Sequence, residues 1–385
     1  MSKKQLLLFS LVLILIFGNG SGFVTMVPFH LSRLGVAPDK IGYLFSLLYF
    51  AMASSGILAG RLADRFGRHK LMSVLSAAGE IFASLLMLLG AQSFPLLATG
   101  LFISWFLAGI HSALISTLLG LQAKENERGR VFGITGFITG LGPIVSGFLY
   151  GKIVDGYGFE TLLTINVGIS VLWTLLALLY KAPAMPALFK KADRQPGRTR
   201  LPGSFYLLVF AAILGWFAIN GGKLGITLVM TRLSFSANDI SLTAGIASLV
   251  ALTIPLLLGW LSDYTGRKPL LLGLNLLGLA GLFLVSRGYG LVGFCAASSL
   301  LSIYSCISGL ANALVADLVP PESIGYGLSL VNGTSFIAGI FSSTLVGLAI
   351  NLLRETTPFM LSMLLPLLAA LLLSRVRENE PNLST

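Results

Sequence analysis

The 385-residue chain has few charged residues, and this scarcity excludes an ordinary soluble protein. Only 11% of the residues are charged and 55% are hydrophobic, whereas soluble domains have about 25% charged residues. A soluble fold would be unable to cover so much apolar surface. A bilayer is therefore the expected solvent, and each helix that crosses it needs roughly 20 consecutive apolar residues.

Cysteine and histidine are also scarce, with two and three copies. Cys295 and Cys306 fall in one predicted helix, about 16 Å apart, which is too far for a disulfide. His30, His69 and His111 are scattered along the chain, and no serine, aspartate and histidine set lies at one depth. The G-x-x-x-x-G-K-[ST] loop that binds ATP phosphates is absent. We therefore expect no enzyme, catalytic residue, metal site or cofactor, and no ATP-driven pump.

Long apolar runs make up most of the sequence. They lie near 6–29, 41–60, 71–91, 95–119, 131–151, 161–180, 205–231, 240–261, 269–286, 290–316, 324–350 and 357–374. These runs predict an all-α membrane protein with twelve transmembrane helices. The one long polar stretch, from Lys181 to Gly203, is rich in proline and basic residues. We expect a six-helix bundle at 1–181, a cytoplasmic linker at 182–203 and a second six-helix bundle at 204–385.

The net charge of +11 does not indicate nucleic-acid binding, because the basic residues gather in alternate loops. With the N-terminus in the cytoplasm, most of the 26 Lys and Arg residues fall in cytoplasmic segments, which is the positive-inside bias. The sequence predicts a multi-pass protein of the plasma membrane (the bacterial inner membrane), with both termini cytoplasmic. We expect a monomer whose partners are lipid and a small-molecule substrate.

A short motif occurs once in each half, after the second helix. The residues from Gly60 through Asp64, Arg65 and Gly67 to Arg68 match those from Gly259 through Asp263 and Gly266 to Arg267. Glycine permits close helix approach and tight turns, and an acid can pair with arginine or with a helix N-terminus. We expect a cytoplasmic gate that holds in one conformation and breaks in another. The alternative is a basic loop that only sets topology.

The doubled loop resembles the signature loop of the major facilitator superfamily, and the resemblance covers the whole chain. It implies two pseudo-symmetric six-helix bundles that rock about a central substrate site. It also implies that Asp64 helps to close the cytoplasmic side. The second copy has Tyr264 where Arg65 stands in the first, so the resemblance supports this role less directly for Asp263.

The fifth apolar run is similar to the G-P-x-x-G-G motif of antiporter members, with Ser146 in place of one glycine. The candidate helix-packing residues are Gly136, Gly140, Gly142, Pro143 and Gly147. Four of them, all except Gly142, share one helical face, along which another helix can slide closely. Ordinary small-residue packing is the alternative.

Two further features indicate which members of this family the chain resembles. The segment from Pro28 to Gly35 resembles the first external loop of bacterial efflux members, such as drug or metabolite antiporters. In the fourth run, however, Trp105 stands where proton-coupled exporters carry an arginine. That family position therefore does not support proton coupling.

Polar residues form a stripe on each of four helices, the first, fourth, seventh and tenth. The resemblance implies that these helices line the substrate cavity, and polar residues inside a membrane are costly and usually functional. The candidate substrate-binding residues are Asn19, His30, Trp105, His111, Trp216, Asn220, Lys223, Ser302, Ser305 and Asn312.

Each of the sharper candidates has an alternative. Lys223 is expected to attract an anionic or zwitterionic group, or else its side chain extends to the outer interface. Trp105 and Trp216 are expected either to stack on a substrate or to serve only as packing residues. Glu80 is the only acid well inside an apolar run, and burial favours the neutral form of a carboxyl group. Glu80 and His111 are thus the candidate proton-coupling residues, with structural pairing and hydrogen-bonded packing as their alternatives.

These features together predict a secondary active transporter. The main hypothesis is proton-coupled efflux of small amphiphilic or metabolite-like compounds by alternating access. The first alternative is transport of an anionic metabolite, sugar or lipid species without proton antiport. The second is a non-transporting membrane sensor, although such a sensor usually adds a large soluble domain.

Overall fold

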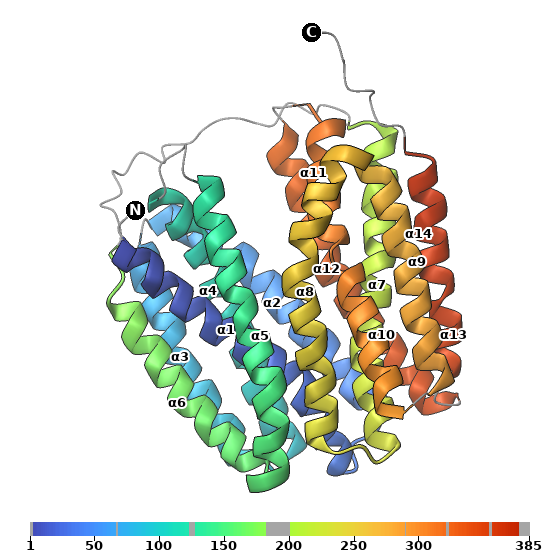
Figure 1. Ribbon diagram of the computed structural model, residues 1–385. Coiled ribbons are helices and arrows are strands. Elements are labelled where there is room, and N and C mark those ends of the chain that lie inside the picture. Colours follow the sequence, from blue (N-terminus) through green and yellow to red (C-terminus); the bar gives the residue numbers. More distant parts are fainter. Residues whose placement is uncertain are drawn as a thin grey trace. The chain divides into compact units, whose positions relative to one another are not determined.

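The computed structural model describes residues 3–66, 68–122, 128–181, 201–288, 290–320, 323–353 and 356–376 (Figure 1). All regular elements in these residues are helices. They are α1 (Lys3–Arg33), α2 (Pro38–Phe66), α3 (His69–Leu89), α4 (Phe94–Gln122), α5 (Arg128–Tyr157), α6 (Phe159–Leu178), α7 (Gly203–Arg232), α8 (Ala237–Thr265), α9 (Arg267–Arg287), α10 (Gly290–Tyr304), α11 (Ile307–Leu318), α12 (Ile324–Leu352), α13 (Thr357–Ser362) and α14 (Leu364–Ser374).

The helices form 12 candidate membrane spans within the described residues. Two spans are interrupted: α10 and α11 together form the tenth, and α13 and α14 the twelfth. The predicted all-α fold with twelve transmembrane helices is confirmed. Glycine makes two of the tight connections, since Gly158 and Gly266 have φ of +86° and +80° directly before α6 and α9, a region that side chains disfavour.

The chain divides into two compact units. The first comprises residues 1–192 and 227–248, and the second comprises 193–226 and 249–385, as far as these are described. The first unit therefore includes the end of α7 and the start of α8. The linker expected at 182–203 lies outside the described residues except for 201–203.

In the first unit, α1 packs against α5, α2 packs against α4, and α3 packs against both α4 and α6. An apolar cluster that includes Phe9, Ile115, Trp173 and Tyr180 fills one end of it. In the second unit, α9 packs against α10, α13 and α14, and α11 packs against α12. These pairings bury apolar side chains of the helices involved, while other apolar side chains stay exposed, as expected of helices that face lipid.

The glycines of α5 make close contacts at some positions and not at others. A Cβ atom on Gly142 would lie 2.4 Å from the Ile14 carbonyl oxygen of α1. A Cβ atom on Gly147 would lie 2.3 Å from the Cα atom of Gly245, in the part of α8 that belongs to the first unit. Nothing outside the local helix backbone, among the described residues, lies within 4 Å of a Cβ atom placed on Gly136, and Gly140 is half-buried. The close helix approach expected of this stripe is thus found at Gly147, and Gly142, which lies off the stripe, makes a second close contact.

Candidate functional site

A cavity of about 270 Å³ lies inside the first unit, and α1 to α6 all contribute to its wall. It is lined by Ile16, Phe17, Asn19, Gly20, Ser21, Phe23, Val24, Met52, Glu80, Met87, Leu101, Ser104, Trp105, Ala108, Ser112, Pro143 and Trp173. The wall is mainly apolar and aromatic. Among these described lining residues, Glu80 is the only one with an ionisable side chain.

The Glu80 carboxyl group projects from the middle of α3, and the residue is only 2% exposed. One oxygen, Oε1, accepts a hydrogen bond from the Ser104 hydroxyl of α4. The other, Oε2, is buried without a hydrogen-bond partner among the described residues, and so is the hydroxyl of Ser112. An ionised carboxylate without a partner is costly away from water. The site therefore favours either a neutral acid or a carboxylate that faces a bound cation.

Asn19 lines the cavity and is fixed by a buried polar network. Its Nδ2 atom donates to Asn166 Oδ1 at 2.6 Å, and Tyr150 donates to its Oδ1 atom at 2.9 Å. Asn166 in turn donates to Ser84, one turn after Glu80 on α3, at 3.0 Å. The network ties α1, α3, α5 and α6 together, so the cavity wall is held by hydrogen bonds as well as by packing.

Trp105 of α4 also lines the cavity, as the sequence suggested. Its ring makes edge contacts with Phe45 and Tyr49 of α2, with centroids 6.2 and 5.4 Å apart. These contacts are typical of aromatic pairs and hold the indole in place.

His111 is fully buried and is not one of the cavity-lining residues. The indole N–H of Trp173 lies 2.9 Å from His111 Nε2, and an indole nitrogen only donates. We therefore assign the proton to Nδ1, which lies 3.1 Å from the Ser73 carbonyl oxygen and can donate to it. Adding a proton at Nε2 would break the bond to Trp173. This geometry favours the packing role of His111 over the proton-carrying role.

His30 is not one of the residues that line the cavity. Its Nε2 atom is 2.7 Å from the Ala91 carbonyl oxygen, and its ring stacks on Phe159 with the centroids 3.9 Å apart. The structure therefore does not bring His30 to Asn19 and Trp105.

The remaining substrate-binding candidates lie in the second unit. Asn220 of α7 donates to the Ser335 carbonyl oxygen of α12 at 3.1 Å. Asn312 of α11 donates to Asn332 of α12 at the same distance. Trp216 is half-buried. The polar stripes of α7 and α11 thus use part of their hydrogen-bonding capacity on α12.

Lys223 is exposed, although the residues on both sides of it in α7 are buried. It lies close enough to Cys306 for an electrostatic interaction. Cys306 marks the break between α10 and α11, where the Ser305 hydroxyl donates to the Ser302 carbonyl oxygen at 2.6 Å. Three of the candidates from the tenth and seventh spans therefore gather at an interrupted helix, which the sequence-based prediction of one continuous span did not anticipate.

The predicted gate is only partly described. The side chains of Asp64, Arg65 and Asp263, and all of Gly67, lie outside the described part of the structure, and Arg68 is exposed. Among the described residues, nothing outside the local helix backbone lies within 4 Å of a Cβ atom placed on Gly60 or Gly259. The close helix approach expected of these two glycines therefore stays a prediction.

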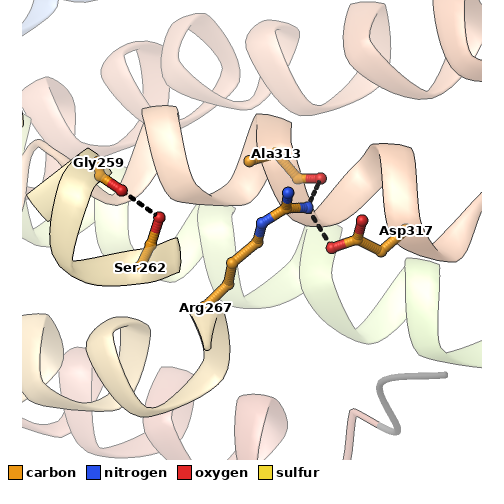
Figure 2. Close-up of polar contacts among 5 residues, drawn as sticks. All are labelled: Gly259, Ser262, Arg267, Ala313 and Asp317. Carbon is orange, nitrogen blue, oxygen red and sulfur yellow. Dashed lines mark hydrogen bonds and ion pairs between the residues drawn. The ribbon is translucent and has the colours of Figure 1, made fainter. Parts of the chain in front are cut away.

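The second copy of the motif makes one clear ionic contact (Figure 2). Arg267 donates to the carboxylate of Asp317 and to the carbonyl oxygen of Ala313, both on α11. In the same view Ser262 donates to the Gly259 carbonyl oxygen at 2.7 Å. Arg267 thus holds the start of α9 against the end of α11.

The sequence reasoning missed Trp173, Ser112 and Asp317. Trp173 and Ser112 were missed because only residues on predicted polar stripes were considered, and α6 was not expected to line a cavity. Asp317 carried a usable signal, since it is an acid at the end of an apolar run.

Comparisons with known proteins identify one family and a related transporter. A family model described as the Major Facilitator Superfamily matches residues 9–231 and 205–385. Multidrug resistance protein MdtL from Salmonella typhi is 24% identical over 333 residues, which cover 80% of this chain and 84% of the relative.

Solved transporters have the same fold. A D-xylose–proton symporter superposes with a TM-score of 0.79 at 16% identity, over 97% of this chain and 98% of the other. A POT family transporter in complex with 5-aminolevulinic acid gives a TM-score of 0.78 at 17% identity, over 96% and 95% of the two chains. At such identities the similarity concerns the fold alone.

Proposed function

Because the chain belongs to the major facilitator superfamily, we propose that it is a proton-coupled efflux transporter of small amphiphilic or metabolite-like compounds that works by alternating access. It is a multi-pass membrane transporter rather than an enzyme. The proposal places it in the bacterial inner membrane with both termini cytoplasmic, in line with the positive-inside bias.

The observation that carries this proposal is the Glu80 carboxyl group in the wall of an apolar cavity. The apolar and aromatic wall suits the body of an amphiphile, and the carboxyl group supplies a place for a proton. The arginine of proton-coupled exporters is absent at Trp105, so coupling has to use another group. The name of the MdtL relative, a multidrug resistance protein, supports export of foreign compounds.

The test is substrate uptake into everted membrane vesicles, measured over a panel of amphiphilic cations, anions and neutral compounds. An acidic lumen should drive accumulation of at least one of these compounds, and a proton ionophore should abolish it, because exchange for protons supplies the free energy. Flux that is indifferent to the pH gradient for every transported compound would sink the antiport proposal.

A second function, transport of an anionic compound, is favoured by one observation. Lys223 lies beside the break between α10 and α11, and interrupted membrane helices often bind substrate groups through their free ends. If Lys223 binds an anion, Lys223→Ala should remove anion transport and spare cation transport. Lys152→Ala, which removes an exposed lysine of α5, is the control. The main proposal expects proton-dependent cation flux to survive Lys223→Ala.

The Arg267–Asp317 pair supports a proposed cytoplasmic gate. The stability that this pair adds to the gate is small, because both side chains are partly exposed to solvent. The two side chains are 29% and 44% exposed, and pairs of this kind contribute about 1 kcal/mol or less. Arg267→Gln and Asp317→Asn should each slow transport, by up to about fivefold. The double variant should be no slower than the slower single variant, because both changes break the same contact.

The matched control for the gate is Arg287→Gln, at the opposite end of α9. Initial rates of substrate efflux from preloaded vesicles measure all four variants. Additive slowing in the double variant, or equal slowing by Arg287→Gln, would show that the contact does not act as a gate.

A further inference from the structure

The cavity of the first unit has a size and lining that fit one class of ligand. We propose that it binds a small organic ammonium ion, with Glu80 as the counter-ion and the indoles of Trp105 and Trp173 against the ligand. This site lies within one six-helix unit. The inference deepens the proposed function and rests on it for the transport of the bound ligand. Binding itself can be measured without transport.

The volume limits the ligand. The cavity holds about 270 Å³, whereas drug-sized pockets measure roughly 300–1,000 Å³. An engineered apolar cavity of about 150 Å³ accepts one benzene molecule. By proportion, this cavity accepts roughly ten non-hydrogen atoms, which is one aromatic ring with a short ammonium group. A cation with several rings exceeds this volume.

The charge of the ligand follows from Glu80. Its Oε2 atom is buried and has no partner among the described residues, and the same holds for the Ser112 hydroxyl. Once its proton has left, the buried carboxylate needs an opposite charge. A divalent metal ion is a poor occupant, because calcium takes six to eight oxygen ligands and the described residues hold no cluster of three metal-binding side chains. An organic cation needs only the one carboxylate.

The aromatic lining favours an ammonium ion over other cations. Trp105 is braced by Tyr49 and Phe45, and Trp173 is held by its hydrogen bond to His111. Indole faces attract ammonium groups through cation–π interactions. Because both rings are fixed before the ligand arrives, little ordering free energy is lost on binding.

Binding is tested by titration calorimetry and tryptophan fluorescence on the purified full-length protein. The probe is phenyltrimethylammonium, which has the right size and a charge that does not change with pH. We expect it to bind at one site per chain. Its neutral isostere, tert-butylbenzene, should bind far more weakly, and the oversized tetraphenylphosphonium should not compete for the site.

Two variants and one control decide the assignment. Glu80→Gln should weaken binding of the probe about 30-fold or more, the lower bound for removing one partner of a buried charge pair. Ala108→Leu, which fills the cavity and keeps Glu80, should also abolish binding. Glu160→Gln removes an exposed carboxylate at the start of α6 and should leave binding unchanged. Thermal unfolding of each variant confirms that it is folded.

The outcomes separate this inference from the proposed function. Equal affinity for phenyltrimethylammonium and tert-butylbenzene, or undiminished affinity in both Glu80→Gln and Ala108→Leu, overturns the ammonium site. Probe binding in a protein whose vesicle flux ignores the pH gradient keeps the site and overturns proton coupling. Proton-driven flux in a protein that does not bind the probe keeps proton coupling and overturns the ammonium site.

Discussion

Replacing Glu80 by Gln should abolish proton-driven accumulation, while downhill movement of the substrate persists at substrate concentrations raised to offset its weaker binding. Glutamine has nearly the same shape and still accepts the hydrogen bond from Ser104, yet it cannot exchange a proton. For a monovalent cation exchanged for one proton, a gradient of one pH unit supports about a tenfold concentration ratio, since one unit is about 1.4 kcal/mol. We expect about this ratio in vesicles with the native protein and no accumulation with Glu80→Gln.

The control for this variant is Glu160→Gln, which removes the same charge at an exposed position and should keep the full ratio. Downhill flux, measured as substrate exchange without a pH gradient, separates loss of coupling from loss of protein. Accumulation by Glu80→Gln that equals that of the native protein would exclude Glu80 from coupling.

The second large effect is expected in the fold itself. Gly142→Ala should destabilise the first unit by about 1–3 kcal/mol, the usual cost of overpacking. The new Cβ atom would lie 2.4 Å from the Ile14 carbonyl oxygen and 2.9 Å from the Gly18 Cα atom. Both are backbone atoms of α1, which cannot rotate away as a side chain could. Thermal unfolding in detergent should show a lowered midpoint and reduced yield.

The same helix provides the matched control. Gly136 has open space around its Cβ position, and alanine is favoured over glycine within a helix by about 0.5–1 kcal/mol. Gly136→Ala should therefore keep or slightly raise the unfolding midpoint. If both variants have the same unfolding midpoint, the close contact between α1 and α5 does not contribute to the stability of the first unit.

The fold was predictable because its cause is local. A run of apolar residues long enough to cross a bilayer has to become a helix, since every backbone polar group needs an internal partner there. The twelve spans therefore followed from hydropathy. The break at Ser305 and Cys306 did not, because no proline or run of polar residues marks it.

The candidate site was predictable only in part. Asn19, Glu80 and Trp105 were identified because polar and bulky residues stand out in an apolar helix. Trp173 was missed because its role depends on a partner 62 residues away, His111. Long-range side-chain pairing of this kind is not encoded in the periodicity of a single helix.

The central claim is that Glu80 exchanges a proton for a cationic ligand inside the cavity. Glu80 is the one ionisable side chain among the described lining residues. Three hydrogen bonds hold the lining: Ser104 donates to Glu80, Tyr150 donates to Asn19, and Trp173 donates to His111.

The most direct measurement is proton release when phenyltrimethylammonium is added to the purified protein in weakly buffered detergent, followed with a pH indicator across pH 5–9. The account predicts release that approaches about one proton per bound cation at pH values where Glu80 is protonated in the free protein. Glu80→Gln should release none. Binding of the cation without proton release at any pH, or equal release from Glu80→Gln, would contradict the account.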